Sequence, residues 1–504
     1  MELLFHEETI RYLAEKRFDQ IYQEQTAEMT VPENRPEIRR IVDCYGIVTV
    51  QNKTVEVGMV SVSGSIQAGV LYVPEEEEGL ERIDVVLPFT VTKKISAGTD
   101  ARLFYWGWLK GIDARMVNSR KVLVRANLGS ELTLFETAEC SFSCIDEQPE
   151  ELCCKTEEYR VKLPLCTAEK EIQIADEVLI PAQEPGVAQL LKWSCGAEIL
   201  DTQIIGDKAV FKGNAALRCL YRTEDEALHV WSTKVPFSQY ADLDREVTDG
   251  IVTVQPIFRQ AELDSDGQID SHRLLLNLSI TAQIVVRGDV PLRLTEDAYS
   301  LSGDFSPEWQ SCEIPACLDY VQQTKTELIN LPPDAARILD WTVTADTPFV
   351  PAAQKDRVVT PVNVNLLYWD SERSLKSKAL RCDVSAQTPD PGESSIRAFA
   401  VPGTDTSLQG GQLELPVQIR LQYDQSRPMR NLCGGSISPA SPQNRASLSA
   451  ARCEGDLWEI AKARRTTVQA LQTVNGLETE RLEEPRLLLI PLGQAAKTAG
   501  EVKK

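Results

Sequence analysis

Val31-Pro32-x-x-Arg35-Pro36-Glu37-Ile38-x-x-Ile41 is the stretch of sequence that decides the fold of this chain, because related stretches follow it twice. It returns as Ile180-Pro181-x-x-Glu184-Pro185-Gly186-Val187-x-x-Leu190, and with less similarity as Leu331-Pro332-Pro333-Asp334-Ala335-x-x-Ile338. The second prolines of successive stretches are 149 and 148 residues apart. Most of the chain is therefore expected to be one kind of domain in three copies.

A second motif keeps nearly the same step, since Leu71-Tyr72 corresponds to Leu220-Tyr221 and to Leu367-Tyr368. The sequence near these motifs alternates between apolar and polar residues, as in Val60-Ser61-Val62-Ser63 and Leu413-Glu414-Leu415. A period of two is typical of β-strands with one buried face. We therefore expect a mainly β protein of three sandwich-like units.

Two kinds of short helix are also predicted. In the N-terminal segment Ile10, Leu13, Ala14 and Ile21 recur at helical spacing, and no Pro or Gly interrupts them. In the repeated stretch, a proline followed by an acidic residue suits the first turn of a helix. The sequence thus predicts an N-terminal helix and a short helix in each repeat. An exposed contact surface between repeats or partners is the alternative for the repeated stretch.

Bulk composition narrows the classes of function. The chain has 504 residues, of which 42% are hydrophobic and 25% charged, which is ordinary for globular domains. Its net charge of −22 argues against nucleic acid as a partner, because phosphate binding needs clustered Lys and Arg. The N-terminal residues lack the features of a signal peptide, and no apolar run is long enough for a transmembrane segment. We therefore expect a cytoplasmic protein.

The 13 cysteines are odd in number and scattered, which indicates reduced thiols. The densest group consists of Cys140-x3-Cys144, Cys153-Cys154 and Cys166. A zinc site would need paired cysteines or histidine, and none of the three histidines is nearby in the sequence. Buried or interface thiols without metal are expected here, and zinc is the alternative.

The last part of the chain differs from the repeats in its composition and in the spacing of its apolar residues. Residues 426–447 are rich in Gly, Ser and Pro, which predicts a flexible linker. Beyond it, Leu457, Ile460 and Ala461 indicate one short helix, and Val468 with Leu471 indicates a second. With flanking strands, the last unit is expected to have the order strand, helix, helix, strand.

The sequence motifs of this unit resemble those of a LysM domain. Gly455-Asp456-Leu457-Trp458-Glu459-Ile460-Ala461, Thr466-Thr467-Val468 and Leu487-Leu488-Leu489-Ile490-Pro491 carry the resemblance. A Thr is absent between Asp456 and Leu457, and Glu484-Pro485-Arg486 replaces the usual Pro-Gly-Gln turn. In LysM domains two loops form a groove for N-acetylglucosamine polymers. The resemblance implies a partner- or glycan-binding groove made of Gly455, Asp456, Leu457, Trp458, Asn475, Gly476 and Leu477.

The triplicated stretch resembles the SPOCS domain of endospore-forming bacteria, whose copies carry a Val-Pro-x-x-Lys-Pro-Asp-Ile-x-x-Ile-Leu phrase. SPOCS domains followed by LysM are the architecture of SipL-like spore-coat morphogenesis proteins. The expected organisation is an N-terminal helical segment at 1–28, repeats at 29–165, 166–311 and 312–425 (divergent), a flexible linker at 426–447, a LysM domain at 448–492 and a tail at 493–504.

The resemblance implies a non-enzymatic scaffold or adaptor in endospore coat assembly. It would act in the mother-cell cytoplasm, be recruited to the forespore surface, and dock through its LysM domain on a coat-basement morphogenetic ATPase. The alternative is a LysM protein that binds peptidoglycan or N-acetylglucosamine polymers. No P-loop, dinucleotide fingerprint or nucleophile elbow occurs in the sequence, so no catalytic residue and no cofactor is expected.

Overall fold

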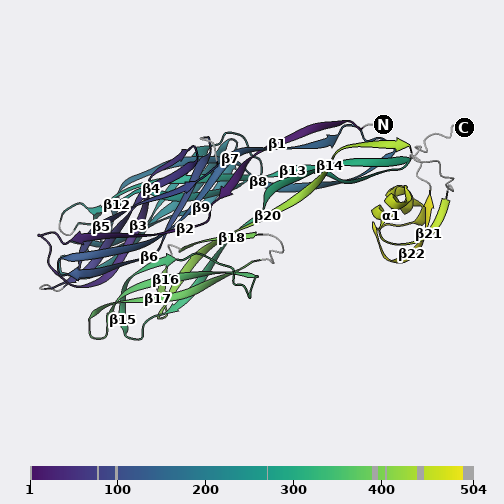
Figure 1. Ribbon diagram of the computed structural model, residues 1–504. Coiled ribbons are helices and arrows are strands. Elements are labelled where there is room, and N and C mark those ends of the chain that lie inside the picture. Colours follow the sequence, from purple (N-terminus) through teal and green to yellow (C-terminus); the bar gives the residue numbers. More distant parts are fainter. Residues whose placement is uncertain are drawn as a thin grey trace.

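The computed structural model is an elongated, mainly β molecule (Figure 1). It describes residues 3–75, 79–96, 100–268, 271–388, 395–402, 406–439 and 448–491. The described strands are β1 (Phe5–Arg17), β2 (Ile21–Thr30), β3 (Ile38–Glu56), β4 (Met59–Pro74), β5 (Glu81–Lys94), β6 (Arg102–Asn118), β7 (Lys121–Ile145), β8 (Leu152–Leu179), β9 (Gln189–Ile205), β10 (Lys208–Arg222), β11 (Leu228–Asp242), β12 (Ile251–Ser265), β13 (Arg273–Ser300), β14 (Gly303–Asn330), β15 (Ala335–Ala345), β16 (Arg357–Asp370), β17 (Leu375–Gln387), β18 (Ser395–Pro402), β19 (Ser407–Gln409), β20 (Gln412–Pro439), β21 (Leu448–Asp456) and β22 (Arg481–Pro491). The described helices are α1 (Leu457–Arg464) and α2 (Val468–Asn475), and neither has the length and apolar character that a membrane span requires.

Three sets of strands have the same order of pairing, and we call them unit 1 (β2–β7), unit 2 (β8–β13) and unit 3 (β14–β20). In each unit three consecutive strands form an antiparallel meander, namely β3-β4-β5, β9-β10-β11 and β15-β16-β17. In each unit the last strand then lies between the first strand and the strand that follows the meander. Two sheets whose apolar faces meet form the core of each unit.

The longest strands run beyond the units and form a stalk, which leads away from the body of the molecule (Figure 1). Three antiparallel ribbons make it: β1 with residues 133–145 of β7, residues 152–164 of β8 with 287–300 of β13, and residues 303–317 of β14 with 424–439 of β20. Tyr12, Phe142, Leu163, Leu292 and Met429 are buried where the ribbons meet. Each ribbon thus buries its apolar face against the other two.

The repeated proline stretch forms a turn, so the prediction of a short helix is wrong at all three places. The Arg35 N–H donates to the Pro32 carbonyl oxygen at 2.9 Å, and strand β3 follows directly. The two repeated motifs meet in space: the Tyr72 hydroxyl donates to the Pro36 carbonyl oxygen at 3.1 Å. A buried hydroxyl needs such a partner, which explains why the proline stretch and the Leu-Tyr motif occur together.

The other two units use the same contact. Tyr221 donates to the Pro185 carbonyl oxygen at 2.9 Å. In unit 3 the Tyr368 hydroxyl reaches the Asp334 carboxylate instead, at 3.3 and 3.4 Å. Asp334 directly follows the corresponding proline. In the least similar stretch, a side-chain carboxylate next to the proline therefore replaces the proline carbonyl oxygen as the acceptor.

The N-terminal helix predicted over residues 1–28 is wrong, because β1 and β2 occupy this segment and pair with β7. Ile10 and Ala14, which suggested a helix, lie with Tyr12 on one face of β1 and pack into the stalk. In β2 exposure alternates strictly, with every second side chain half-buried. Two apolar residues four positions apart share one face in a helix and also in a strand. The pairing with β7 therefore determines that this segment is a strand.

Each meander has a β-bulge at the same place, and the side chains of the three bulges pack together between the units. The register shifts occur at Val42, Leu191 and Leu339, which are the unpaired residues between paired neighbours. All three side chains are buried in one core that the units share. The leucines of the three Leu-Tyr motifs also belong to this core, while each tyrosine points into its own unit. The bulge therefore directs an apolar side chain to the centre of the assembly.

The residue after each bulge is charged and buried, and the three residues meet. Lys192 Nζ lies 2.7 Å from Asp43 Oδ2 and 2.8 Å from Asp340 Oδ2, and Arg218 Nε adds a bond of 2.6 Å to Asp340. Burial raises the pKa of Asp43, which has Lys192 as its cationic partner. Burial opposes the ionisation of Asp340 as well, but Lys192 and Arg218 together hold its pKa below the usual range. The units thus share an ion cluster inside their common core.

The expected domain limits differ from the strand limits. The boundaries after residues 165 and 311 fall inside β8 and β14, which run continuously from stalk to body. The flexible linker predicted over 426–447 is wrong for residues 426–439, which belong to β20 and pair with β14. Residues 440–447 of that prediction, and the tail at 493–504, lie outside the described residues. Pairing with a long neighbouring strand therefore overrides the Gly- and Pro-rich composition.

Candidate functional site at the junction of stalk and C-terminal module

The C-terminal module consists of β21, α1, α2 and β22, which is the expected order of strand, helix, helix and strand. Both helices have capped N-termini. The Asp456 carboxylate accepts a hydrogen bond from the Trp458 N–H at 2.7 Å, and Thr467 Oγ1 accepts one from the Ala470 N–H at 3.1 Å. Helix α2 ends at Gly476, whose φ of 61° lies in the left-handed region that favours glycine.

The structure brings the two loops of the expected groove together. The Leu457 N–H donates to the carbonyl oxygen of Glu480 at 2.9 Å, which joins the start of α1 to the segment after α2. Gly476 is exposed between them, and Gly455 and Leu477 are half-buried. Several side chains of the expected groove already have partners within the protein.

Three of the seven predicted groove residues have roles within the module. Asp456 caps α1, and Leu457 is fully buried in the module core. The Asn475 side chain binds the backbone of β22, since its Nδ2 donates to the Leu489 carbonyl oxygen and its Oδ1 accepts from the Leu489 N–H, both at 2.7 Å. These contacts fix the two loops in place, and they occupy the polar atoms that a ligand would otherwise use.

The fourth, Trp458, contacts the tip of the stalk. Its indole Nε1–H donates to Asp297 Oδ2 at 2.8 Å, and its ring packs edge-on against Tyr299 with centroids 5.0 Å apart. Lys462, one turn further along α1, reaches both oxygens of Asp297 at 2.7 Å. The Tyr299 hydroxyl donates to the Thr466 carbonyl oxygen at 2.7 Å. Helix α1 is therefore bound to β13 through its indole, its ammonium group and its C-terminus.

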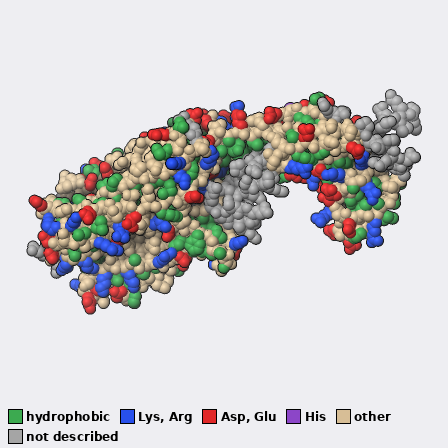
Figure 2. Space-filling model, in the orientation of Figure 1, with side chains coloured by type: hydrophobic (Ala, Val, Ile, Leu, Met, Phe, Trp, Pro, Cys, Tyr) green, Lys and Arg blue, Asp and Glu red, His purple; other side chains and the backbone are tan. Residues whose placement is uncertain are grey.

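Asp297 is the centre of this contact. Burial opposes the ionisation of Asp297, but the hydrogen bonds from Lys462 and Trp458 outweigh it and hold the pKa of the carboxyl below its usual range. A second ion pair joins Arg465 to Asp304 at the start of β14. Figure 2 shows acidic and basic side chains close together where the module meets the stalk. Opposite charges thus hold the two parts together at neutral pH.

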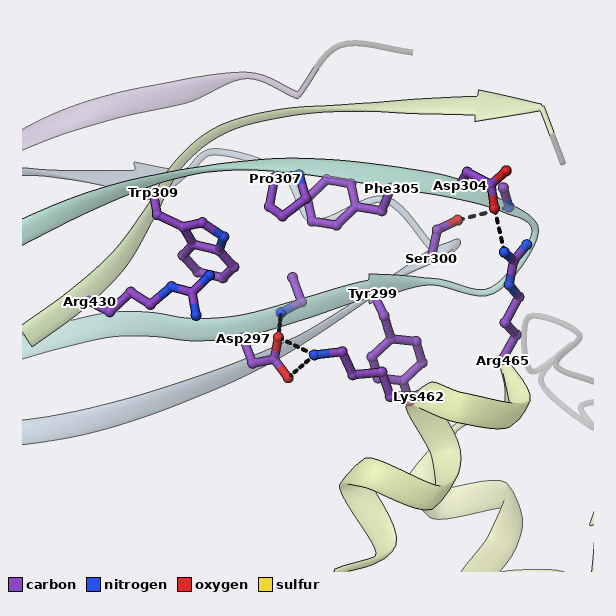
Figure 3. A pocket seen from close by; sticks show the side chains of 12 residues that line it. Asp297, Tyr299, Ser300, Asp304, Phe305, Pro307, Trp309, Arg430, Lys462 and Arg465 are labelled. Carbon is purple, nitrogen blue, oxygen red and sulfur yellow. Dashed lines mark hydrogen bonds and ion pairs between the residues drawn. The ribbon is translucent and has the colours of Figure 1, made fainter.

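A cavity of about 360 Å³ lies beside this contact (Figure 3). Phe305, Pro307 and Trp309 of β14 form its apolar wall, and Lys462 and Arg465 face it from the module. The guanidinium of Arg430 lies over the Trp309 ring, 3.6 Å from the ring centroid. A guanidinium over an aromatic ring is held by a favourable cation–π contact and can still donate hydrogen bonds through its N–H groups, which suits an acidic group in the cavity.

The sheet of the module presents an apolar face to solvent. Leu488 and Ile490 of β22 are buried against the helices, so the alternating Leu487 and Leu489 point away from them. Leu487 is 68% exposed and Leu489 is 42% exposed, and Leu448 of β21 is 50% exposed beside them. We call Leu448, Leu487 and Leu489 the outer leucines. They lie on the sheet face opposite the helices, whereas α1 contacts the stalk.

The sequence did not indicate Asp297, Tyr299 or Asp304 as partners of the module. These residues follow a strand pattern like that of the rest of β13 and β14, and no local motif marks them. Their role depends on where the module docks, which is a long-range contact. Trp458 was identified from the sequence, but its contact with the stalk was not.

Fold and site together define a mainly β, multi-unit protein with a docked α/β module. Residues 186–264, which contain β9, β10 and β11 and most of β12, match the sequence model of the family described as "SipL, SPOCS domain". The match indicates a sporulation-related family for this part of the chain. No curated protein and no solved structure matches the chain significantly.

Proposed function

We propose that this chain is a non-enzymatic scaffold or adaptor in endospore coat assembly. The observation that carries the proposal is the SPOCS match of residues 186–264 in unit 2. The common pairing order of the three units extends the proposal to units 1 and 3 as SPOCS domains. On this proposal the protein acts in the mother-cell cytoplasm and is recruited to the forespore surface.

The proposed docking element is the C-terminal module, taken as a LysM domain, and its proposed partner is a coat-basement morphogenetic ATPase. The outer leucines support this choice, because exposed apolar side chains gathered on one face of a soluble domain mark surfaces at which proteins associate. The module lies at the end of the stalk, away from the body (Figure 1). A partner can therefore reach it without contacting the three units.

Binding of the full-length chain to the purified ATPase tests the proposal. The double variant Leu487→Ala, Leu489→Ala is expected to bind at least about tenfold more weakly than the wild type. Thr473→Ala, an exposed change on α2, is the matched control and should bind normally. Wild-type binding by the double variant would contradict the module as docking element.

The second candidate function is binding of N-acetylglucosamine polymers by the same module. One observation favours it: the two loops of the expected groove lie side by side. A titration of the full-length chain with N-acetylglucosamine oligomers, run in parallel, separates the two proposals. Saturable sugar binding that Gly476→Asp abolishes, without binding to the ATPase, would replace the adaptor with a glycan-binding protein.

A further inference from the structure

The ribbon of β1 and β7 brings together three side chains that can bind a metal ion. In the β1–β7 register His6 lies opposite Cys144, and Glu8 is two residues along β1 on the same side of the strand. The expectation that no histidine lies near the cysteine group is therefore wrong for Cys144. Strand pairing, rather than distance in the sequence, places His6 beside it.

The ligand atoms have the spacing that a small metal ion needs. His6 Nε2, a Glu8 carboxylate oxygen and Cys144 Sγ all lie within 4.8 Å of one another, and His6 Nε2 is 3.4 Å from Glu8 Oε1. From metal–ligand distances of about 2.0–2.3 Å, two ligand atoms of tetrahedral zinc are roughly 3.3–3.6 Å apart. The histidine and glutamate already have that separation, and Cys144 Sγ lies within 4.8 Å of both.

A further carboxylate orients the histidine. His6 Nδ1 lies 2.6 Å from Asp146 Oδ1, and the Asp146 N–H donates to the Leu4 carbonyl oxygen at 3.1 Å, which fixes Asp146 next to the ring. An Nδ1–H held by a carboxylate leaves the lone pair on Nε2, on the side of Glu8 and Cys144. Carboxylate–histidine pairs of this kind support histidine ligands of zinc.

We propose that His6 Nε2, Glu8 and the Cys144 thiolate bind one Zn²⁺ ion on the stalk, with water as the fourth ligand. The mixture of imidazole, thiolate and carboxylate suits zinc, whereas Ca²⁺ and Mg²⁺ require oxygen ligands alone. The ion links the first strand of the chain to β7. Because β1 lies at the edge of its sheet, the bound ion resists separation of the N-terminal strand from the stalk.

Metal titrations of the reduced, metal-free, full-length protein test the proposal. With Co²⁺ as probe, the wild type is expected to bind one ion at this site and to show thiolate-to-cobalt charge-transfer absorption. His6→Ala should weaken Zn²⁺ binding, measured against a chromophoric chelator, by at least about tenfold, and Asp146→Asn should weaken it by about tenfold. Cys144→Ser should remove the charge-transfer absorption.

Matched controls separate this site from binding by other thiols. Cys140→Ser changes a half-buried cysteine of the same strand outside the ligand set, and His229→Ala changes a histidine of unit 2. Both should bind Zn²⁺ and Co²⁺ as the wild type does. His6 is exposed, so His6→Ala should keep the thermal midpoint of the metal-free protein and lose only the increase that Zn²⁺ gives the wild type. Absence of Co²⁺ uptake by the wild type, or unchanged binding by His6→Ala, would overturn the proposal.

Discussion

Asp43 and Lys192 occupy corresponding positions in units 1 and 2, and their side chains bind each other at 2.7 Å inside the core that the three units share. Asp340 has the same position in unit 3 and completes the cluster. Three identical ionic residues at this position would place three like charges together, which is strongly unfavourable in a buried site. The units are therefore alike in fold but not interchangeable, because closure requires a cation between two anions.

Lys192→Met tests this cluster. The change shortens the unbranched side chain by one atom and leaves Asp43 and Asp340 without their common cation, and breaking a buried ion pair costs about 3–5 kcal/mol. The thermal and denaturant midpoints of the full-length protein should fall markedly at neutral pH. Lys208→Met is the control, because the Lys208 side chain on β10 is 43% exposed and pairs with Asp242 outside the shared core.

A second substitution in the same cluster shows whether charge is the cause. Asp43 is the carboxylate whose pKa burial raises, so it is the one that most needs Lys192. Asp43→Asn added to Lys192→Met should recover part of the lost stability, because it removes an unpaired buried charge. Equal midpoints for wild type and Lys192→Met, or no recovery in the double variant, would show that packing alone joins the units.

The repeated motifs predicted the mainly β architecture, because their period of two reflects burial of one face and depends on local sequence alone. The wrong predictions share one physical cause, which is long-range strand pairing. Ile10 and Ala14 suit a helix as well as a strand, and β7 decides between them by supplying backbone partners. Similarly, Gly434 and Gly435 indicate a loop, yet they lie in β20 opposite β14.

The candidate site divides in the same way. Trp458 and the two loops were identified from local motifs, since capping and turn chemistry are local. The docking partner Asp297 was missed because the contact joins residues 161 positions apart. The alternation of apolar and polar residues in Ala27-Glu28-Met29-Thr30-Val31, at the end of β2 and just beyond it, is a signal in the sequence that could have corrected the N-terminal helix.

Tyr221→Phe measures what the contact between the two repeated motifs contributes. The variant keeps the ring but removes the hydrogen bond to the Pro185 carbonyl oxygen, which should cost about 1 kcal/mol. Tyr72→Phe should cost a similar amount in unit 1, and the two effects should be nearly additive because the sites are separate. The thermal midpoint of each variant provides the measurement. Tyr240→Phe, at an exposed tyrosine, should leave it unchanged.

Stability in acid should depend on Glu15, which joins the N-terminal strand to unit 2. Arg287 Nη2 lies 2.7 Å from Glu15 Oε2, and Arg17 binds the other oxygen. Burial opposes the ionisation of Glu15, but the two arginines outweigh it and lower its pKa from 4.5 to about 2. A carboxyl whose pKa is lower in the folded state stabilises the fold above its unfolded pKa. That contribution, about 3 kcal/mol, is lost as the pH falls from about 4.5 to about 2.

Glu15→Gln should therefore be less stable than the wild type at pH 7, and the difference should shrink steadily below about pH 4.5. Thermal midpoints of the two proteins across that range give the comparison. Glu24→Gln is the control, since Glu24 pairs with Arg125 at the exposed surface and should show little difference at any pH. A difference between wild type and Glu15→Gln that is constant with pH would contradict the role of ionised Glu15.

Asp297→Asn should release the C-terminal module from the stalk. The change removes the ion pair with Lys462 and weakens the bond from the Trp458 indole, which together are worth about 1–2 kcal/mol, or roughly a tenfold change in the docked population. Cys153 of β8 reports on it, because this half-buried thiol packs against the module. Its rate of alkylation, followed by peptide mass spectrometry, should rise in the variant.

The exposed Asp289 lies on the same strand, so Asp289→Asn is the matched control and should leave the alkylation rate of Cys153 unchanged. The same pair of variants distinguishes two modes of partner binding. If the partner uses the outer leucines, Asp297→Asn should bind it as the wild type does, because those side chains are exposed in the docked module. If the partner instead binds Trp458, it must compete with Asp297 for this side chain. Asp297→Asn should then strengthen partner binding by about the same factor by which it weakens docking of the module on the stalk.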